Sequence, residues 1–275
     1  MGTQMKYIVS DHHNFWQRGL GNSDIQEADV VFSWTDWPFA DQMRALQSFG
    51  KKVIVWEHGF GALSDYSNNN KPMIADGYLA IGKESAKCVE GQPCLVVGNP
   101  IYDNLKKKTQ QTGRALFVAL HWVSGVADNN LRGADVTGYN QDTYSKLKEA
   151  YDFEWDVKIS DKALMTEEGD NVWYSGVEGV RSLPRIKNRL PKYDAIFTPK
   201  SGTLDSFAKL MGVPVYITDE QESWRAKGDP KCFKIKGDNY IKIGDKLEPK
   251  KVDMTDYIKT PSVDMDVILD WVKTL

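Results

Sequence analysis

A Ser-Gly-Thr turn between a predicted strand and a predicted helix carries the clearest chemical signal in this sequence. Ser201, Gly202 and Thr203 follow the apolar run 195–198 and open an amphipathic stretch that ends at 211. Hydroxyl groups and unpaired backbone N–H groups at a helix N-terminus bind phosphate oxygens, because the free amides and the helix dipole both favour negative charge. The spacing therefore predicts a phosphate-binding turn; the alternative is an ordinary helix start capped by Ser201.

Histidines are the second group of candidates, and each lies just after a predicted strand. The chain has four: His12, His13, His58 and His121. Because the carboxyl ends of parallel strands meet at one edge of a sheet, we expect these side chains on the ligand-binding side. Imidazole titrates near neutral pH, so His58 or His12 could take a proton from an acceptor hydroxyl, with Asp11 as the next candidate base. A purely structural role is the alternative for any single histidine.

The tripeptide Asp11-His12-His13 has a second interpretation. It resembles the "DHH" motif of phosphoesterases that bind two metal ions through Asp and His side chains. Those enzymes need further Asp-rich motifs and a Gly-rich His segment downstream, and this sequence has neither. The remaining Cys and His residues also lack the close spacing typical of metal ligands, so we expect no metal site.

The elements that position these residues follow the pattern of parallel α/β architecture, in which β-branched runs alternate with amphipathic stretches. In the first half, strands are expected at 6–10, 29–34, 52–56, 77–81 and 94–97. After a polar segment at 103–113 the pattern restarts, with strands at 115–120, 153–159, 195–198 and 213–218. Helices are expected at 38–49, 142–151, 177–190, 203–211 and 263–275. The pattern predicts two domains, 1–104 and 105–260, and a closing C-terminal helix at 261–275.

Composition narrows the class of protein. The chain has 275 residues, 41% of them hydrophobic, and a net charge of −3, which does not suggest a dedicated nucleic-acid-binding domain. No apolar run approaches the roughly 18 residues of a membrane span, and no leader segment is apparent. The three cysteines form no CxxC pair, so we expect reduced thiols and a cytoplasmic protein.

Four short motifs, at 56–59, 97–103, 120–121 and 201–214, occur along the chain in the same order as in a known superfamily. They are the Ser201-Gly202 turn with the later Gly212-Val213-Pro214, the stretch Val97-Gly98-Asn99-Pro100 ending at Asp103, the strand end Trp56-Glu57-His58-Gly59, and Leu120-His121. Together they resemble the non-hydrolysing UDP-N-acetylglucosamine 2-epimerases, the CDP-glycerol glycerophosphotransferases and, more loosely, the GT-B glycosyltransferases. The resemblance implies two Rossmann-like parallel-sheet domains facing a cleft, in a compact version because this sequence is short for these families.

This sequence differs from the epimerase motifs at two places that concern the chemistry. The epimerase Glu that bonds the nucleotide ribose is replaced, because Ser206 and Phe207 stand at its positions; Asp205 could substitute for it. The epimerase continuation "HRxEN" is also absent, since Trp122 follows His121. These departures lower the expectation of epimerase chemistry and leave nucleotide-sugar binding in place.

The function expected from the residues and the resemblance is transfer of a sugar from a nucleotide-sugar donor, UDP-linked by analogy, to an acceptor hydroxyl. In this hypothesis the Ser-Gly-Thr turn binds the donor diphosphate, and His121 is a further donor-binding residue. Asp205 or Glu220 would bind ribose or sugar hydroxyls, and His58, His12 or Asp11 would act as the base. The resemblance implies metal-independent chemistry with no cofactor beyond the co-substrate.

Alternatives stay open at this point. A polyol phosphate could replace the sugar, the chain could be an epimerase-like isomerase, or it could bind a nucleotide sugar without turnover. The acceptor could be a glycan, a lipid-linked carrier or a small molecule. The basic segment 225–251, with nine Lys or Arg against four Asp or Glu, also leaves a nucleic-acid base open as acceptor.

Overall fold

The computed structural model describes the backbone of residues 5–9, 23–34, 36, 39–57, 59–64, 66, 71–119, 136–158, 186–198, 203–218 and 235–275. Within these ranges, side chains are described except at residues 23, 136–139, 186–188, 203 and 205. The described chain divides into two compact units. The first holds the residues up to Asn104 together with Ile235 and Asp253–Leu275, and the second holds the rest.

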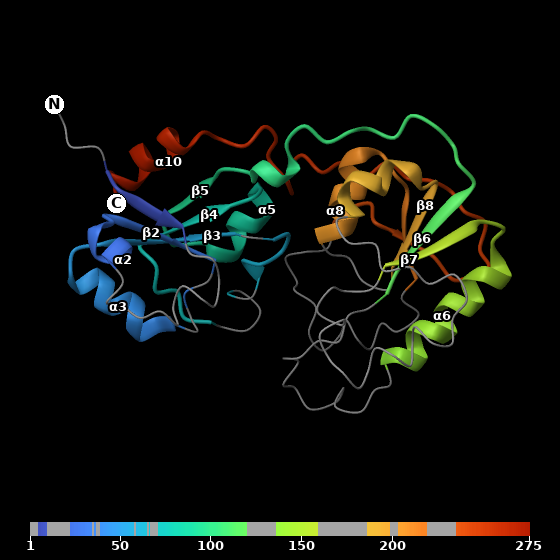
Figure 1. Ribbon diagram of the computed structural model, residues 1–275, viewed down its shortest axis with the longest axis horizontal. Helices are drawn as coiled ribbons and strands as arrows, with labels where there is room; N and C mark the ends of the chain where they lie inside the picture. Colours follow the sequence, from blue (N-terminus) through green and yellow to red (C-terminus); the bar gives the residue numbers. More distant parts are fainter. Residues whose placement is uncertain are drawn as a thin grey trace. The chain divides into compact units, whose positions relative to one another are not determined.

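The first unit is built on one parallel sheet with the strand order β1-β2-β3-β4-β5. Its elements are β1 (Tyr7–Val9), α2 (Ser23–Glu27), β2 (Val30–Ser33), α3 (Ala40–Ser48), β3 (Lys52–Trp56), β4 (Gly77–Ala80), α5 (Lys83–Ala86), β5 (Cys94–Val96) and α10 (Met265–Val272), with 3₁₀ turns at Lys87–Val89 and Pro100–Tyr102. The inner strands are continuous apolar runs because both faces of a parallel sheet are covered. Figure 1 shows α3 and α10 on opposite faces of this sheet.

Topology explains why the first sheet needs the C-terminal helix. The strands β1 to β5 lie in the sheet in the same order as in the sequence, so each connection leads to the next strand in the same direction. Because crossovers between parallel strands are right-handed, all these connections are expected to pass over the same face of the sheet. Residues of these connections, such as Met43 and Leu46 of α3, pack on that face with Val31 and Val53. The other face is covered by α10, whose Ile268 packs in a separate core cluster.

The segment that leads to α10, which we call the C-terminal strap (residues 253–263), is bonded to the first unit along its length. Lys259 N donates to Ile81 O at 2.9 Å and Val263 N to Val97 O at 2.8 Å. Asp103, the last residue of the Gly-Asn-Pro motif, accepts from Ser262 N at 3.0 Å. The structure therefore places 253–260 with the first unit, whereas the sequence pattern assigned those residues to the second domain.

Glycines make room for the strap. A Cβ atom at Gly82 would lie 2.1 Å from the carbonyl oxygen of Tyr257, and one at Gly98 would lie 2.4 Å from that of Lys259. Gly98 also has φ +75°, a conformation that favours glycine. The Gly-Asn-Pro motif, identified by resemblance, thus serves to dock a segment distant in sequence.

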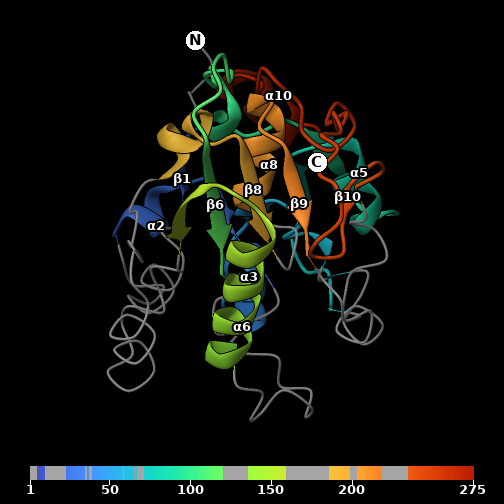
Figure 2. The same cartoon turned by 90° about the vertical axis from the view of Figure 1, so that its right-hand side faces the viewer.

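The second unit has a parallel sheet with the order β10-β9-β8-β6-β7. Its elements are β6 (Arg114–Val118), α6 (Val136–Ala150), β7 (Glu154–Lys158), a 3₁₀ helix (Ile186–Lys192), β8 (Ala195–Thr198), α8 (Thr203–Met211), β9 (Val215–Ile217) and β10 (Asn239–Tyr240). The helix expected at 177–190 lies mostly outside the described residues, and its end forms the start of the 3₁₀ helix. Helices α6 and α8 lie on opposite faces of this sheet (Figures 1 and 2).

Aromatic side chains fill the α6 face. Phe197 of β8 stacks on Tyr216 of β9, with ring centroids 5.2 Å apart, and on Tyr151 at 5.4 Å. Phe117 of β6 stacks on Tyr144 of α6 at 5.9 Å. Many of the chain's aromatic residues are therefore core residues of this unit rather than stacking platforms on its surface.

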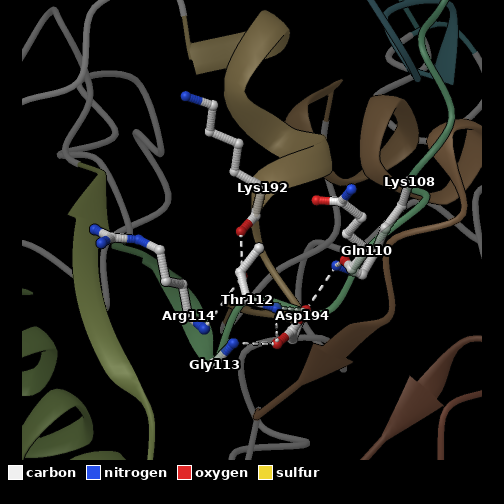
Figure 3. Close-up of polar contacts among 7 residues, drawn as sticks. All are labelled: Lys108, Gln110, Thr112, Gly113, Arg114, Lys192 and Asp194. Carbon is white, nitrogen blue, oxygen red and sulfur yellow. Dashed lines mark hydrogen bonds and ion pairs between the residues drawn. The ribbon is translucent and has the colours of Figure 1, made fainter.

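Asp194 lies at the amino-terminal edge of this sheet, where it anchors the segment that enters the second unit (Figure 3). Its carboxylate accepts from Lys108 Nζ at 2.6 Å, from Thr112 N at 2.8 Å and from Gly113 N at 2.6 Å. Partial burial opposes ionisation, but these hydrogen bonds outweigh it and lower the pKa of Asp194. Parallel α/β proteins bind ligands at the carboxyl-terminal edge of the sheet, which is the other edge. This cluster therefore serves to hold the chain where it enters the second unit.

Candidate functional site

The carboxyl-terminal edge of each sheet is where parallel α/β proteins bind ligands. The sequence-predicted residues follow strands that end at these edges. Seven of them lie outside the described residues: Asp11, His12, His58, His121, Ser201, Gly202 and Glu220. Thr203 and Asp205 lie in the first turn of α8, where the backbone alone is described. Their roles therefore stay predictions, and the site is built here from the elements around them.

The second unit has a topological switch point at β6. The chain leaves β6 through α6 to β7 on one side, and β8 pairs with β6 on the other side. Phe117 of β6 pairs with Val157 of β7 and with Phe197 of β8. Because α6 and α8 lie on opposite faces of the sheet (Figure 2), the connections out of β6 and β8 lead to opposite faces. Divergence of this kind opens the crevice that doubly wound folds use for ligands.

Both predicted donor-binding segments leave the strands that flank this switch point. His121 follows β6 and the Ser201-Gly202 pair follows β8, directly before α8 begins at Thr203. Sequence spacing identified the turn, but strand order alone makes the ends of β6 and β8 neighbours. The N-terminus of α8 follows the end of β8, and free amides at a helix N-terminus favour an anion.

Buried polar residues that the sequence analysis did not identify lie at the same edge. Lys158 ends β7, Thr198 ends β8 and Thr218 follows β9, with exposed fractions of 9%, 4% and 1%. Thr218 N donates to Thr198 O at 3.0 Å, which places these two residues side by side. The Thr218 hydroxyl has no hydrogen-bond partner within the described part of the chain. A basic or hydroxylated residue at the end of an apolar strand was the only sequence signal for this set.

In the first unit, Glu57 follows β3 and is fully buried. Its carboxyl group accepts from Ile81 N at 2.8 Å and from Ser85 Oγ at 3.0 Å. Burial raises the pKa of Glu57 from 4.5 to about 7, although these hydrogen bonds act to lower it. The Glu57 side chain thus binds inward, to the β4–α5 turn.

Asp36, just beyond β2, is a second fully buried carboxylate. It accepts from the hydroxyls of Tyr66 at 2.5 Å and Tyr78 at 2.7 Å, and from the amides of Ile74 at 2.8 Å and Ala75 at 3.0 Å. Burial, followed by the Asp36 charge, raises the pKa of Tyr78. Asp36 and Glu57 therefore tie the ends of β2 and β3 to neighbouring segments of the first unit.

The strap limits which part of that edge can receive a ligand. It bonds to Ile81 after β4 and to Val97 after β5, and it leaves no space for a Cβ atom at Gly82 or Gly98. Because the strap covers them, the ends of β4 and β5 are not accessible to a ligand. The ends of β1, β2 and β3, which precede the candidate bases and Asp36, are the remaining strand ends of the sheet.

No group of three or more His, Cys, Asp or Glu side chains with metal-binding geometry occurs among the residues whose side chains are described. Across the same part of the chain, none of the helices is both long enough and apolar enough to span a bilayer.

Comparison with known proteins identifies the fold. No protein-family model and no curated protein sequence matches the chain. Among solved structures, the UDP-GlcNAc 2-epimerase of Methanocaldococcus jannaschii, in complex with UDP-GlcNAc and UDP, aligns with a TM-score of 0.57 at 12% identity. The alignment covers 91% of this chain and 77% of the epimerase.

Two other solved structures align less well. The pneumococcal O-GlcNAc transferase GtfA gives a TM-score of 0.41 at 11% identity, over 78% of this chain and 45% of the transferase. The wall teichoic acid polymerase TagF, as its H444N variant, gives 0.46 at 12% identity, over 79% of this chain and 62% of the polymerase. The chain thus spans less than two thirds of either of these two proteins.

Two parallel five-stranded sheets with helices on both faces define an α/β protein made of two Rossmann-like units. More particularly, the chain has the GT-B-type fold, which it shares with the UDP-GlcNAc 2-epimerase above. The fold class expected from the sequence motifs is therefore confirmed.

Glu57 makes a testable contribution to the pH dependence of stability. Between pH 4.5 and about 7 the folded chain keeps a proton on Glu57 that the unfolded chain has released. The stability contributed by this group is therefore complete below pH 4.5 and is lost as the pH rises to about 7. The shift corresponds to about 3 kcal/mol.

We expect Glu57→Gln to remove this dependence. Urea unfolding of both proteins between pH 4.5 and 8 measures it, and the difference between their unfolding free energies should change by about 3 kcal/mol across the window. A constant difference would show that Glu57 titrates normally.

Proposed function

We propose that the chain transfers a sugar from a nucleotide-sugar donor to an acceptor hydroxyl. The observation that carries this proposal is the switch point of the second unit, where β6 and β8 pair side by side and the nine-residue helix α8 follows β8. The GT-B-type fold supports it, because the M. jannaschii epimerase of the same fold was solved with UDP-GlcNAc and UDP. UDP-linked sugars are therefore the first donors to test.

In this proposal the second unit binds the donor. The α8 N-terminus, with Ser201, Gly202 and Thr203, would bind the diphosphate, because free helix amides favour an anion. Asp205 or Glu220 would bind ribose or sugar hydroxyls. Lys158, at the neighbouring strand end, adds a cation that can stabilise the leaving diphosphate. We propose that neither a metal ion nor a cofactor beyond the co-substrate is required.

The first unit would bind the acceptor. The acceptor oxygen attacks the anomeric carbon, the bond from that carbon to the nucleoside diphosphate breaks, and the hydroxyl proton passes to a base. His58, after β3, is the first candidate base, followed by His12 and Asp11. A glycan, a lipid-linked carrier, a small molecule or a nucleic-acid base could supply the hydroxyl or equivalent nucleophile.

Ligand-dependent melting tests the donor site. A ligand that binds only the folded chain raises the free energy of unfolding by about 2.7 kcal/mol at a hundredfold excess over Kd, so UDP or UDP-GlcNAc should raise the melting temperature. Replacing both turn hydroxyls (Ser201→Ala with Thr203→Ala) should weaken this binding about tenfold or more. His58→Ala is the matched control and should leave it unchanged.

Two results would contradict the assignment. If no nucleoside diphosphate or sugar nucleotide shifts the melting temperature at millimolar concentration, the donor site is wrong. If the double variant binds like the parent, the turn is only a helix cap.

An epimerase-like isomerase is the second candidate, because the structure with a TM-score of 0.57 is a UDP-GlcNAc 2-epimerase. The two reactions give different products. Incubation of UDP-GlcNAc without acceptor, followed by NMR, should show unchanged donor or slow release of UDP for a transferase. Accumulation of the C2 epimer would favour the isomerase.

A further inference from the structure

Lysines gather at the amino-terminal edge of the second sheet, the edge opposite to the predicted donor site. This edge is formed by the segments that enter β6, β8 and β10 and by the chain that leaves the unit after β10. Six exposed lysines stand on these segments: Lys106, Lys107, Lys192, Lys236, Lys250 and Lys251. The last three belong to the basic segment 225–251, which has no role in the proposed function.

Hydrogen bonds place the segment that enters β6 beside two others. The Lys107 ammonium donates to Leu210 O at the C-terminal end of α8. Thr112 Oγ1 donates to Lys192 O at 2.6 Å, which brings the turn before β8 next to the same segment. In Figure 3 the Lys192 ammonium points away from Asp194.

The segments before and after β10 join the same edge through α8. Lys209, in the last turn of α8, is ion-paired with Asp238, which directly precedes β10. Asn239 Nδ2 donates to Glu248 O at 3.0 Å, and the lysine pair 250–251 follows in the sequence. Tertiary structure therefore collects lysines from four separate segments on one edge of one unit, which we call the basic edge.

Few carboxylates balance the basic edge. Two of its acids are already ion-paired, Asp194 with Lys108 at 2.6 Å and Asp238 with Lys209. Two others are exposed, Glu248 and, before β7, Asp152. Six exposed lysines against two exposed carboxylates leave a surplus of four positive charges, whereas the whole chain carries −3.

This surface fits the headgroups of an anionic bilayer better than a nucleic acid. Single-stranded nucleic acids bind where basic groups alternate with aromatic stacking platforms. Here Tyr193 is buried and Phe153 packs on the aromatic core. A nucleic-acid acceptor bound at the basic edge would also lie opposite to the predicted donor site. About four to eight clustered Lys or Arg side chains are typical of surfaces that bind anionic phospholipids.

We propose that the basic edge docks the chain on a membrane surface that carries anionic phospholipids. The lysine ammonium groups contact headgroup phosphates, and the carboxyl-terminal edge of the same sheet faces away from the bilayer. The proposal does not depend on the proposed function, because none of the six lysines belongs to the predicted donor-binding or catalytic residues.

Sedimentation of the full-length chain with vesicles tests this directly. The chain should bind vesicles of equal parts phosphatidylglycerol and phosphatidylcholine, should not bind pure phosphatidylcholine, and should be released by high salt, which screens the attraction. Lys250→Gln with Lys251→Gln should lower the binding constant about tenfold or more, since one lysine near an anionic surface contributes about fivefold.

Two further double variants separate the basic edge from general charge. Lys106→Gln with Lys192→Gln takes two charges from other segments of the edge and should cause a similar loss. Lys83→Gln with Lys87→Gln is the matched control: it removes two charges from the first unit, where these side chains are 71% and 64% exposed, and should change binding less than about twofold. All three should melt like the parent.

Three results would overturn the proposal. The first is a parent chain that does not bind anionic vesicles. The second is an equal loss of binding in the control and in the variants of the basic edge. The third is binding of a labelled single-stranded oligonucleotide in place of vesicles, weakened by the same variants, which would assign the basic edge to nucleic acid.

Discussion

Removal of residues 261–275 should unfold the first unit and leave the second folded. Ile268, Leu269 and Val272 of α10 are 0%, 8% and 1% exposed, and they cover the face of the first sheet opposite to α3. Full burial of such side chains contributes about 1.5–3 kcal/mol each, so their loss amounts to a large part of the roughly 5–15 kcal/mol that stabilises a domain.

Single substitutions in α10 measure how much this helix contributes to the free energy of unfolding of the first unit. Ile268→Ala should lower the free energy of unfolding by about 2–5 kcal/mol, because it opens a cavity against the sheet. Val267→Ala is the matched control on the same helix, and it should change stability by less than about 0.5 kcal/mol because Val267 is 51% exposed. Urea unfolding gives the free energies, and hydrogen exchange assigns the loss to one unit. Equal effects of the two variants would show that α10 does not pack on this sheet.

Lys209→Met should lower the free energy of unfolding of the second unit by about 3–5 kcal/mol. Lys209, in the last turn of α8, is ion-paired with Asp238, the residue before β10, and their side chains are 2% and 1% exposed. Removal of the ammonium leaves a buried carboxylate without its cation, which costs more than the pair itself contributes. Because this pair joins the predicted donor-binding helix to the edge strand, its loss should also weaken UDP binding.

Two controls isolate the charge effect. The double variant Lys209→Met with Asp238→Leu should recover most of the lost stability, since an apolar pair of similar volume is tolerated where a single buried charge is not. Lys146→Met breaks an exposed pair with Asp142 at 2.8 Å and should cost less than about 1 kcal/mol. Urea unfolding measures the free energy of unfolding of the single Lys209→Met variant, the double variant and the Lys146→Met control. An effect of Lys209→Met no larger than that of Lys146→Met would contradict the burial of the pair.

Local sequence was sufficient for nine of the ten described strands, and the two-residue β10 was not expected. The strands β2, β3, β4 and β8 contain consecutive apolar residues because both faces of a parallel sheet are covered, and such runs are recognised without knowing their neighbours. The polar segment before β6 marks where the chain enters the second unit at Leu105. The motifs predicted the fold class correctly for the same reason, since each is a local strand-to-turn junction.

The side chains of all nine predicted site residues lie outside the described part of the chain, and their roles stay predictions. What the structure adds is their setting. The sequence showed that the Ser-Gly-Thr turn precedes a helix, but only strand order brings the end of β6 beside the end of β8. The sequence does not encode strand order in any local pattern, because parallel strands of similar composition can pair in several orders.

The partners of buried polar groups were likewise decided by tertiary structure. Glu57 lies next to the candidate base His58 in the sequence, and its side chain binds Ile81 and Ser85, 24 and 28 residues away. Asp103 binds Ser262 across 159 residues, and the amphipathic pattern of α10 revealed an apolar face without indicating the sheet that buries it. Periodicity tells which side of an element is buried, because that depends on its own residues; which surface buries it depends on the path of the whole chain.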